Sequence, residues 1–336
     1  MNIRDRSAIH HAAGMSLENA KGDPKKILLV YLAIITGLSL AVAAVSVILS
    51  NRIADTGGLG NMGLRSVLST AKSVLPLIQS VILLGLEMGY CTMALNIARG
   101  ERISGDTLFG GFRRFFPLLR AQILLGFLYF GLGLLAVYPG AYIFLMLPMS
   151  KDFYEVLTPM MESASTLTGT VTIDEATMAA ATEAMMPALW IMGILFLLLL
   201  IPTHYRYRML TYRLIDQPRP GALRAMRESR AMMHRNRIAL FRLDLSLWWF
   251  YLLQLLVMVL CYGDMLLPLV GITLPWSETV SYFVFMVLSL LLQFVVYYFF
   301  MNRVAVTYAT AYQALLPEKQ PKEPTPVPAN PWQDQY

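Results

Sequence analysis

The stretch LLLLIPTHYRYRMLTYRLIDQP, residues 197–218, passes from pure hydrocarbon into alternating tyrosine and arginine. This change is typical of a transmembrane helix that leaves the apolar core of a bilayer, because aromatic rings sit at headgroup level and arginines reach the phosphates. The side chains predicted to form an aromatic belt are His204, Tyr205, Tyr207 and Tyr212. The arginines predicted to contact headgroups are Arg206, Arg208 and Arg213.

The composition of the whole chain supports a membrane protein. Of 336 residues, 57% are hydrophobic and only 14% are charged, whereas soluble domains carry about 25% charged residues. A backbone inside a bilayer must pair its own polar groups, so the expected fold class is an all-α membrane protein. The net charge of +6 lies mainly in the connections between apolar blocks, which argues against a nucleic-acid partner.

A helix needs about 20 apolar residues to cross the hydrocarbon core. Six blocks meet this requirement and predict spans at about 27–50, 73–98, 118–149, 187–210, 243–270 and 279–312. The third block contains Pro139 and Gly140, which predict a kink or break there. The spans make a transmembrane domain of residues 27–316, between a cytoplasmic amphipathic segment (1–26) and a disordered, proline-rich cytoplasmic tail (317–336).

Lysine and arginine counts in the connections predict the orientation. Residues 206–242 hold ten of them, residues 150–186 hold one, and residues 263–278 hold none. Because basic connections stay inside, we expect both termini in the cytoplasm, residues 150–186 as an outer loop, and a location in the bacterial cytoplasmic membrane.

Residues 219–237 are predicted to be a cytoplasmic, arginine-rich amphipathic helix. Its apolar side would hold Ala222, Ala225, Met226, Ser229, Met232 and Met233, and its other side Arg224, Arg227, Arg230, Arg235 and Arg237. Two interpretations stay open and do not exclude each other: the helix lies on the inner leaflet with its arginines among anionic headgroups, or it packs on its own bundle. Similar polar segments precede the first and third spans, which suggests three repeats of an interfacial helix followed by two spans.

Three acidic residues stand out among the apolar and basic segments. Glu87 lies close to the middle of the second block, where a carboxylate is costly and is either a proton or cation site or a structural residue. Asp244 is predicted to pair with an arginine of 206–213 and to join the fourth span to the fifth. Glu228 is predicted to pair within its own helix, because Arg224 lies four residues before it.

Other motifs carry little chemistry. GLGNMG, at 58–63, matches a dinucleotide-binding spacing but joins two predicted spans instead of a strand and a helix. Cys91 and Cys261 both lie in apolar blocks, and the histidines lack metal-ligand spacing. We therefore expect no cofactor, no metal site and no catalytic residues.

Several segments in order resemble domain-of-unknown-function family 975, a family of bacterial integral membrane proteins. They are GDTLFGGFRRFF, the YPG at 138–140, HYRYRMLTYRLIDQP (204–218), GALRAMRESRAMMHRNR (221–237) and LFRLDLSLWW (240–249). The resemblance covers most of the chain apart from the outer loop and the tail. It implies a topology and a membrane location, and it implies no reaction.

The leading hypothesis is a non-enzymatic multi-pass membrane protein that interacts with lipid or belongs to an envelope or transport system. Its expected partners are the phospholipid bilayer and anionic lipid headgroups. The alternative is a small secondary transporter or channel that uses Glu87. An intramembrane enzyme acting on lipids is a third hypothesis, disfavoured because few polar residues share one depth.

Overall fold

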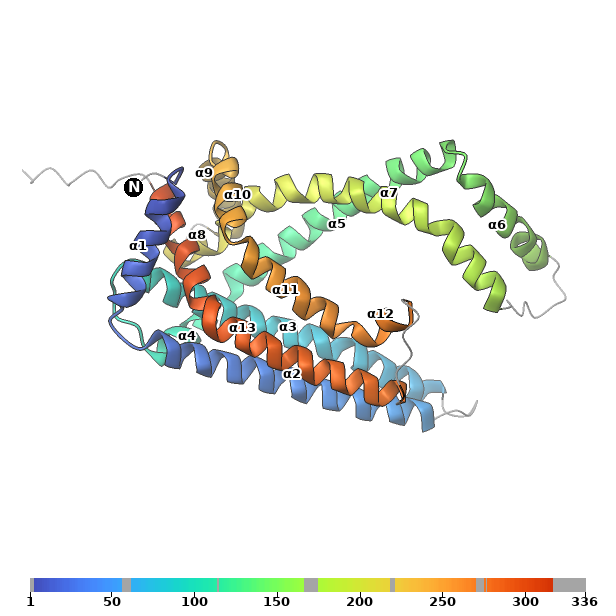
Figure 1. Cartoon of the computed structure of the whole chain (residues 1–336), viewed down its shortest axis with the longest axis horizontal. Helices are drawn as coiled ribbons and strands as arrows, with labels where there is room; N and C mark the ends of the chain where they lie inside the picture. The colour runs from blue at the N-terminus through green and yellow to red at the C-terminus, as the bar shows by residue number, and fades with distance from the viewer. Residues whose placement is uncertain are drawn as a thin grey trace, which may run out of the picture. The chain divides into compact units, whose positions relative to one another are not determined.

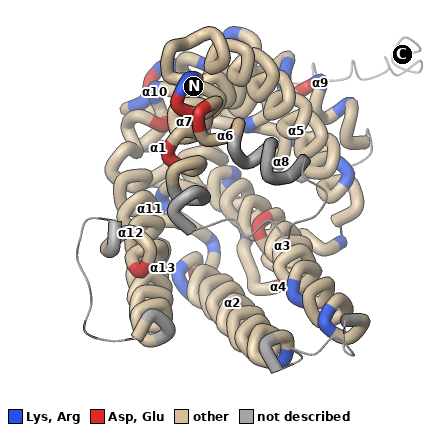
Figure 2. The backbone as a smooth tube through the Cα atoms, turned by 90° about the vertical axis from the view of Figure 1, so that its right-hand side faces the viewer, with Lys and Arg blue, Asp and Glu red and all other residues tan. Residues whose placement is uncertain are grey.

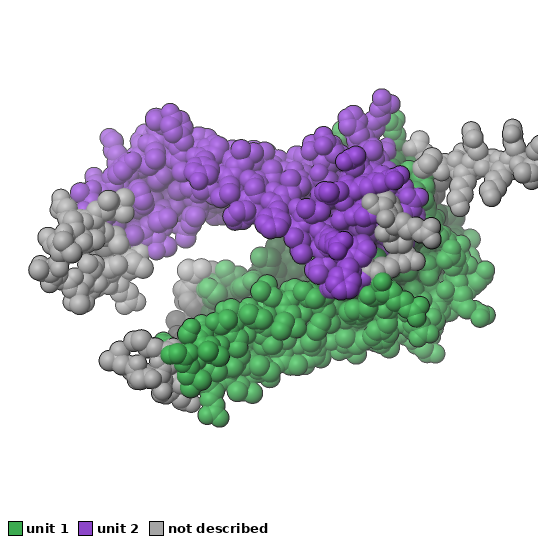
Figure 3. Space-filling model, turned by 180° about the vertical axis from the view of Figure 1, so that it is seen from behind, with its two compact units in different colours: residues 1–113, 238–336 green, residues 114–237 purple. Residues whose placement is uncertain are grey.

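The computed structural model describes residues 3–55, 62–113, 115–165, 175–217, 221–269, 275 and 277–316. These residues form helices, with one isolated β-bridge between Lys21 and Arg102 (Figure 1). The predicted tail at 317–336, Arg219 and most of the GLGNMG segment lie outside the described residues. Contacts divide the chain into two compact units, coloured separately in Figure 3: unit 1 is 1–113 with 238–336, and unit 2 is 114–237.

Unit 1 contains three long helices that contact one another, α2, α3 and α13, and run side by side in Figure 1. Its helices are α1 (Arg6–Glu18), α2 (Pro24–Asp55), α3 (Met62–Ala98), α4 (Gly105–Arg113), α10 (Arg237–Ser246), α11 (Trp248–Cys261), α12 (Gly263–Leu269) and α13 (Glu278–Leu315). The first residue of α10 is counted with unit 2 and the rest of the helix with unit 1. We call the end that carries Lys25, Lys26, Arg99 and Arg303 the basic end of unit 1.

Unit 2 is built on the contact between two long helices, α5 and α7. Its helices are α5 (Phe115–Met146), α6 (Ser150–Ser165), α7 (Glu175–Tyr207), α8 (Leu210–Asp216) and α9 (Gly221–Met233). Of the predicted kink or break at Pro139, the break is wrong, because α5 is one helix through that residue. A side chain at Gly140 would reach the Cα of Met192 at 3.2 Å, so the small residue allows close packing of α5 on α7.

The connection predicted as an outer loop, residues 150–186, is largely helical, and its side of the membrane stays a prediction. Helix α6 occupies its first half, and α7 begins at Glu175 and continues into the span without interruption. Residues 166–174 between them lie outside the described residues.

Five helices are long and apolar enough to cross a membrane, and they correspond to five of the six predicted spans. The exception is the fifth, predicted as one helix at 243–270. There α10 ends at Ser246 and α11 begins at Trp248, with a bend of 67° between them. Alone, the 14 residues of α11 extend about 21 Å, less than the roughly 30 Å hydrocarbon core. The described residues thus contain five such helices, or up to six if the bent pair makes one span.

The long helices expose large apolar side chains along much of their length. Leu77 and Val67 on α3 are 64% and 65% exposed, and Phe299 on α13 is 66% exposed. Figure 2 shows these helices as mostly uncharged tubes. Because soluble proteins rarely expose apolar surface of this extent, these helices are those of a membrane-embedded protein.

The well-packed core of unit 1 lies at its basic end. Helix α13 has 38 residues, about 57 Å, so it is longer than a bilayer's hydrocarbon core. Its last turns are buried from Val306 to Tyr312, and α1 and α3 pack against α13. Buried residues of the neighbouring helices complete this core: Ile9, Ala13, Met93, Leu95, Leu108, Leu240 and Leu243.

Helix α4 approaches the backbone of α3 through glycines. A Cβ atom at Gly89 would lie 1.7 Å from the Leu108 carbonyl oxygen, and one at Gly111 would lie 2.3 Å from the Gly85 carbonyl oxygen. The two helices are therefore in backbone contact, which only residues without a side chain permit.

Candidate functional site

The end of α7 and the helix α8 carry the stretch in which tyrosine and arginine alternate. Arg208 Nη1 lies 3.0 Å from His204 Nε2, one helical turn away. Arg206 is half-buried, and its Nε is buried without a hydrogen-bond partner among the described residues. Tyr212 is only 7% exposed and belongs to the buried side of α8. The prediction that Tyr212 stands in an aromatic belt is therefore wrong.

Helix α9 has one buried side and one arginine side. Ala222, Ala225, Ser229 and Met233 are buried, and the helix contacts α5, α7 and α8 of its own unit. The Ser229 hydroxyl donates a hydrogen bond to the carbonyl oxygen of Arg206 at 3.4 Å. The buried side of α9 is therefore covered by protein. This agrees with the interpretation that the segment packs on its own bundle.

The opposite side of α9 exposes Arg224, Arg227 and Arg230, which we call the arginine face. Arg227 and Arg230 have no hydrogen-bond or ion-pair partner among the residues that the structure describes. The helix is shorter than the predicted 219–237, because it ends at Met233. Arg235 lies exposed in the following turn, and Arg237 is the half-buried first residue of α10.

Glu228 fixes α9 to α8. It accepts a hydrogen bond from Arg213 Nε at 2.6 Å and another from Arg224 Nε at 3.0 Å. The hydrogen bond from Arg213, followed by that from Arg224, lowers the pKa of Glu228 despite some desolvation. The single carboxylate of α9 is thus engaged with two arginines, and the charge of the arginine face stays positive.

Asp244 accepts a hydrogen bond of 2.7 Å from the Tyr308 hydroxyl, which also hydrogen-bonds Tyr251. These contacts join α10, α11 and α13 within unit 1. The structure therefore gives Asp244 a tyrosine partner that the sequence did not predict. The proposed pairing of Asp244 with an arginine of 206–213 stays a prediction.

Glu87 lies on an exposed side of α3, and its carboxylate is within Coulombic range of the hydroxyls of Tyr31 and Tyr297. The position of Glu87 close to the middle of its span stays a prediction. Sequence reasoning missed both tyrosines.

Helix α1 is held to α10 by His10, whose Nε2 lies 2.7 Å from the Ser246 hydroxyl oxygen. Burial lowers the pKa of His10, and the charges of Arg303 and Arg6 lower it further. The folded protein therefore favours neutral His10.

This lowered pKa predicts acid sensitivity. Below the ordinary histidine pKa of about 6.5, the unfolded chain binds a proton that folded His10 resists, so the free energy of unfolding falls as the pH drops. We expect the melting temperature of His10→Gln to depend less on pH between 7.5 and 5.5 than that of the wild type. His11→Gln is the matched control, because His11 is exposed on the same helix. Equal pH dependence of both variants would exclude this role of His10.

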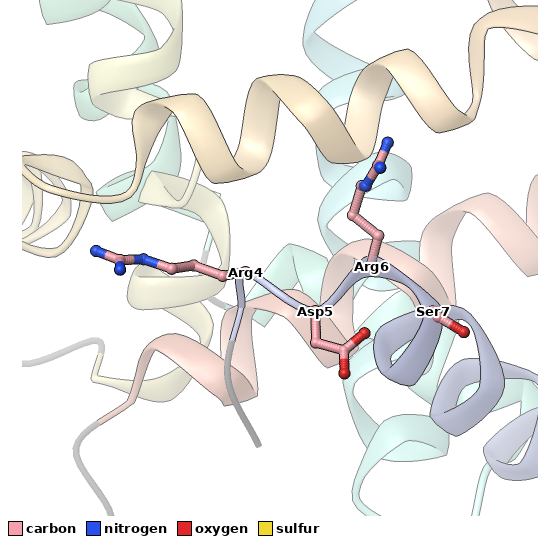
Figure 4. A pocket seen from close by; sticks show the side chains of 4 residues that line it. All are labelled: Arg4, Asp5, Arg6 and Ser7. Atoms are coloured by element: carbon pink, nitrogen blue, oxygen red, sulfur yellow. The ribbon is translucent and has the colours of Figure 1, made fainter.

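An open hollow of about 590 Å³ lies at the start of α1, lined by Arg4, Asp5, Arg6 and Ser7 (Figure 4). Asp5 serves the helix itself, because its carboxylate accepts a hydrogen bond of 3.1 Å from the Ala8 amide. No group of three or more His, Cys, Asp and Glu side chains in the described part of the chain is arranged to hold a metal ion. Neither Cys91 nor Cys261 forms a disulfide bond in the structure.

Comparisons with known proteins give one match. A family model described as "Protein of unknown function (DUF975)" matches residues 1–317. The match includes the 150–186 segment, which the resemblance read from sequence motifs left out. No curated protein and no solved structure matches the chain significantly.

Proposed function

The chain belongs to the DUF975 family of proteins of unknown function, and we propose that it is a non-enzymatic, multi-pass protein of the bacterial cytoplasmic membrane that binds anionic phospholipid headgroups through α9. The observation that carries this proposal is the arginine face. Arg227 and Arg230 are exposed on a helix whose other side is packed on protein. The proposal therefore needs no insertion of α9 into the bilayer, only a position beside it.

The charge distribution supports an orientation for this face. Residues 206–242 carry ten lysines and arginines, whereas residues 263–278 carry none. By the positive-inside rule we assign the arginine-rich connection and both termini to the cytoplasm. The cytoplasmic leaflet is the one that presents anionic headgroups to such a segment.

The expected strength follows from the number of charges. A basic residue near an anionic leaflet contributes about 1 kcal/mol. Arg227 and Arg230 together would then contribute about 2 kcal/mol, or about a 30-fold change in affinity. Arg224 contributes less to lipid binding in this proposal, because it already pairs with Glu228.

The test uses the whole protein in neutral detergent, with phosphatidylglycerol or phosphatidylcholine added. We expect phosphatidylglycerol to raise the melting temperature of the wild type more than phosphatidylcholine does. The double variant Arg227→Gln/Arg230→Gln should lose most of this difference, and 0.5 M salt should reduce it in the wild type because salt screens exposed charges.

The matched control is Arg65→Gln/Lys72→Gln, which removes two exposed charges from α3 of unit 1. It should keep the full response to phosphatidylglycerol. If both double variants respond like the wild type, the arginine face does not bind anionic lipid.

A further inference from the structure

Helix α10 lies at the basic end of unit 1. His10 Nε2 of α1 lies 2.7 Å from the hydroxyl oxygen of Ser246 on α10. The hydroxyl of Tyr308, which follows Arg303 on α13, donates a hydrogen bond of 2.7 Å to Asp244 of α10. Both contacts join α10 to segments beside the basic residues, not to the apolar middle of the long helices. Because basic residues mark the level where spans leave the hydrocarbon core, α10 belongs at headgroup level.

Helix α10 does not continue the direction of α11. The two helices are bent by 67° at their junction (Figure 1), and α11 packs on the long helix α13. Helix α12 follows α11 after one residue and also contacts α13. The segment formed by α11 and α12 therefore follows α13 without α10, whereas α10 turns away from it at the basic end.

Apolar side chains cover two opposite sides of α10. One side is buried and consists of Leu240, Leu243 and Leu247. The other side is exposed, and we call its residues together with the first residue of α11 the apolar ridge: Ile238, Leu245 and Trp248, which are 70%, 57% and 60% exposed. At 100° per residue, Leu245 lies about 20° from Ile238, and the buried leucines lie about 140° or more from it. Protein therefore covers one apolar side of α10 and leaves the other accessible.

The apolar ridge continues into the exposed apolar surface of α11. Leu252 and Leu255 lie four and seven residues after Trp248, and both are exposed. Arg242 is also exposed on α10, about 40° from Ile238 around the helix. A charged side chain is costly in the middle of a bilayer, but it is tolerated at headgroup level, where tryptophan is also enriched. An exposed apolar row beside Arg242 and Trp248 therefore fits the interfacial layer of a bilayer.

We propose that α10 is an interfacial helix that inserts the apolar ridge among the acyl chains of the leaflet at the basic end of unit 1. A helix at this level with an apolar side toward the acyl chains removes that side from water, which is favourable. The occupant is the acyl region of the bilayer, so neutral phospholipid is sufficient. The ridge belongs to unit 1 and the arginine face to unit 2, and either proposal can fail without the other.

Spin labels on single cysteines test the position of the ridge. The full-length protein with Cys91→Ala and Cys261→Ala is reconstituted into phosphatidylcholine nanodiscs, and Ile238→Cys or Leu245→Cys carries a nitroxide. Oxygen dissolves in acyl chains, whereas a nickel chelate stays in water, so the ratio of their collision rates with the label reports depth. We expect a ratio several times higher at both ridge positions than at a label in water.

Three further labels calibrate this measurement. Glu18→Cys is the control in water, because Glu18 is exposed at the end of α1. Leu255→Cys is the control in acyl chains, because Leu255 is exposed in the middle of α11. Arg242→Cys should give a ratio between those of Glu18 and Ile238, because it lies beside the ridge on the same helix.

An apolar diazirine that partitions into the bilayer tests the unmodified protein. After photolysis, mass spectrometry should find adducts on the apolar ridge and none on the peptide that contains Glu18. Ridge labels that collide more with nickel than with oxygen would place the ridge in water. Labels reached by neither reagent would place it against protein, including a second copy of the chain. Either result, or the absence of diazirine adducts from residues 238–248, would overturn the proposal.

Discussion

Gly89→Ala is expected to destabilise unit 1 by about 3 kcal/mol or more, at the upper end of what overpacking costs. The added Cβ would lie 1.7 Å from the carbonyl oxygen of Leu108 and 2.5 Å from its carbonyl carbon. Both atoms belong to the backbone of α4, so no side-chain rotation relieves the overlap. Because α4 has only nine residues, its position depends on this contact. Gly111→Ala should act similarly, since its Cβ would meet the Gly85 carbonyl oxygen.

Gly110→Ala is the matched control for this prediction. A Cβ at Gly110 would have no atom within 4 Å, and alanine favours a helix over glycine by about 1 kcal/mol. Melting temperatures of the purified protein in detergent should therefore fall for Gly89→Ala and stay level or rise for Gly110→Ala. If both variants raise the melting temperature, the backbone contact between α3 and α4 is wrong.

Asn302→Leu is expected to cost about 3 kcal/mol, because it leaves buried polar groups unpaired. Asn302 accepts from the Tyr90 hydroxyl at 2.7 Å and donates to the Pro24 carbonyl oxygen at 3.3 Å. It thus joins α13 to α3 and α2 at the basic end of unit 1. Tyr90 and Asn302 are 2% and 7% exposed, so water does not replace the lost bonds.

A double-mutant cycle separates this hydrogen bond from a simple packing defect. Tyr90→Phe should destabilise the wild type, but it should cost little in the Asn302→Leu protein, where the hydroxyl has already lost its acceptor. Stability is measured as the melting temperature of each of the four proteins. Strictly additive losses would mean that the Tyr90–Asn302 bond contributes nothing.

The long helices were predictable because an apolar block of sufficient length has few alternatives in a bilayer. The bend between α10 and α11 was not, because no proline or glycine lies near Ser246. The Ser246 hydroxyl donates to the Leu243 carbonyl at 2.6 Å and also contacts His10. A serine hydrogen bond to a carbonyl one turn back often bends a helix. The residue that supplies the second contact lies 236 positions away, so periodicity carries no sign of it.

Some contacts of the candidate sites could also be predicted from the sequence, and others could not. The pairing of Arg224 with Glu228 was predictable from their spacing of four residues. The shorter hydrogen bond between Glu228 and Arg213 was not predictable, because these residues lie fifteen positions apart on two different helices. The spacing of Gly85 and Gly89 signals a close helix contact, but it does not identify α4 as the partner. Similarly, Glu87 stood out in the sequence, whereas Tyr31 and Tyr297 become its neighbours only through the contacts of α2 and α13 with α3.

The most direct test of the central proposal is photocrosslinking of the full-length protein in bilayers that contain phosphatidylglycerol with a photoactivatable headgroup. Because the arginine face is exposed beside its own unit, adducts should map to residues 221–237 and should largely disappear in Arg227→Gln/Arg230→Gln. Adducts that form equally with a phosphatidylcholine analogue, or that map mainly around Arg65 and Lys72, would contradict the proposal.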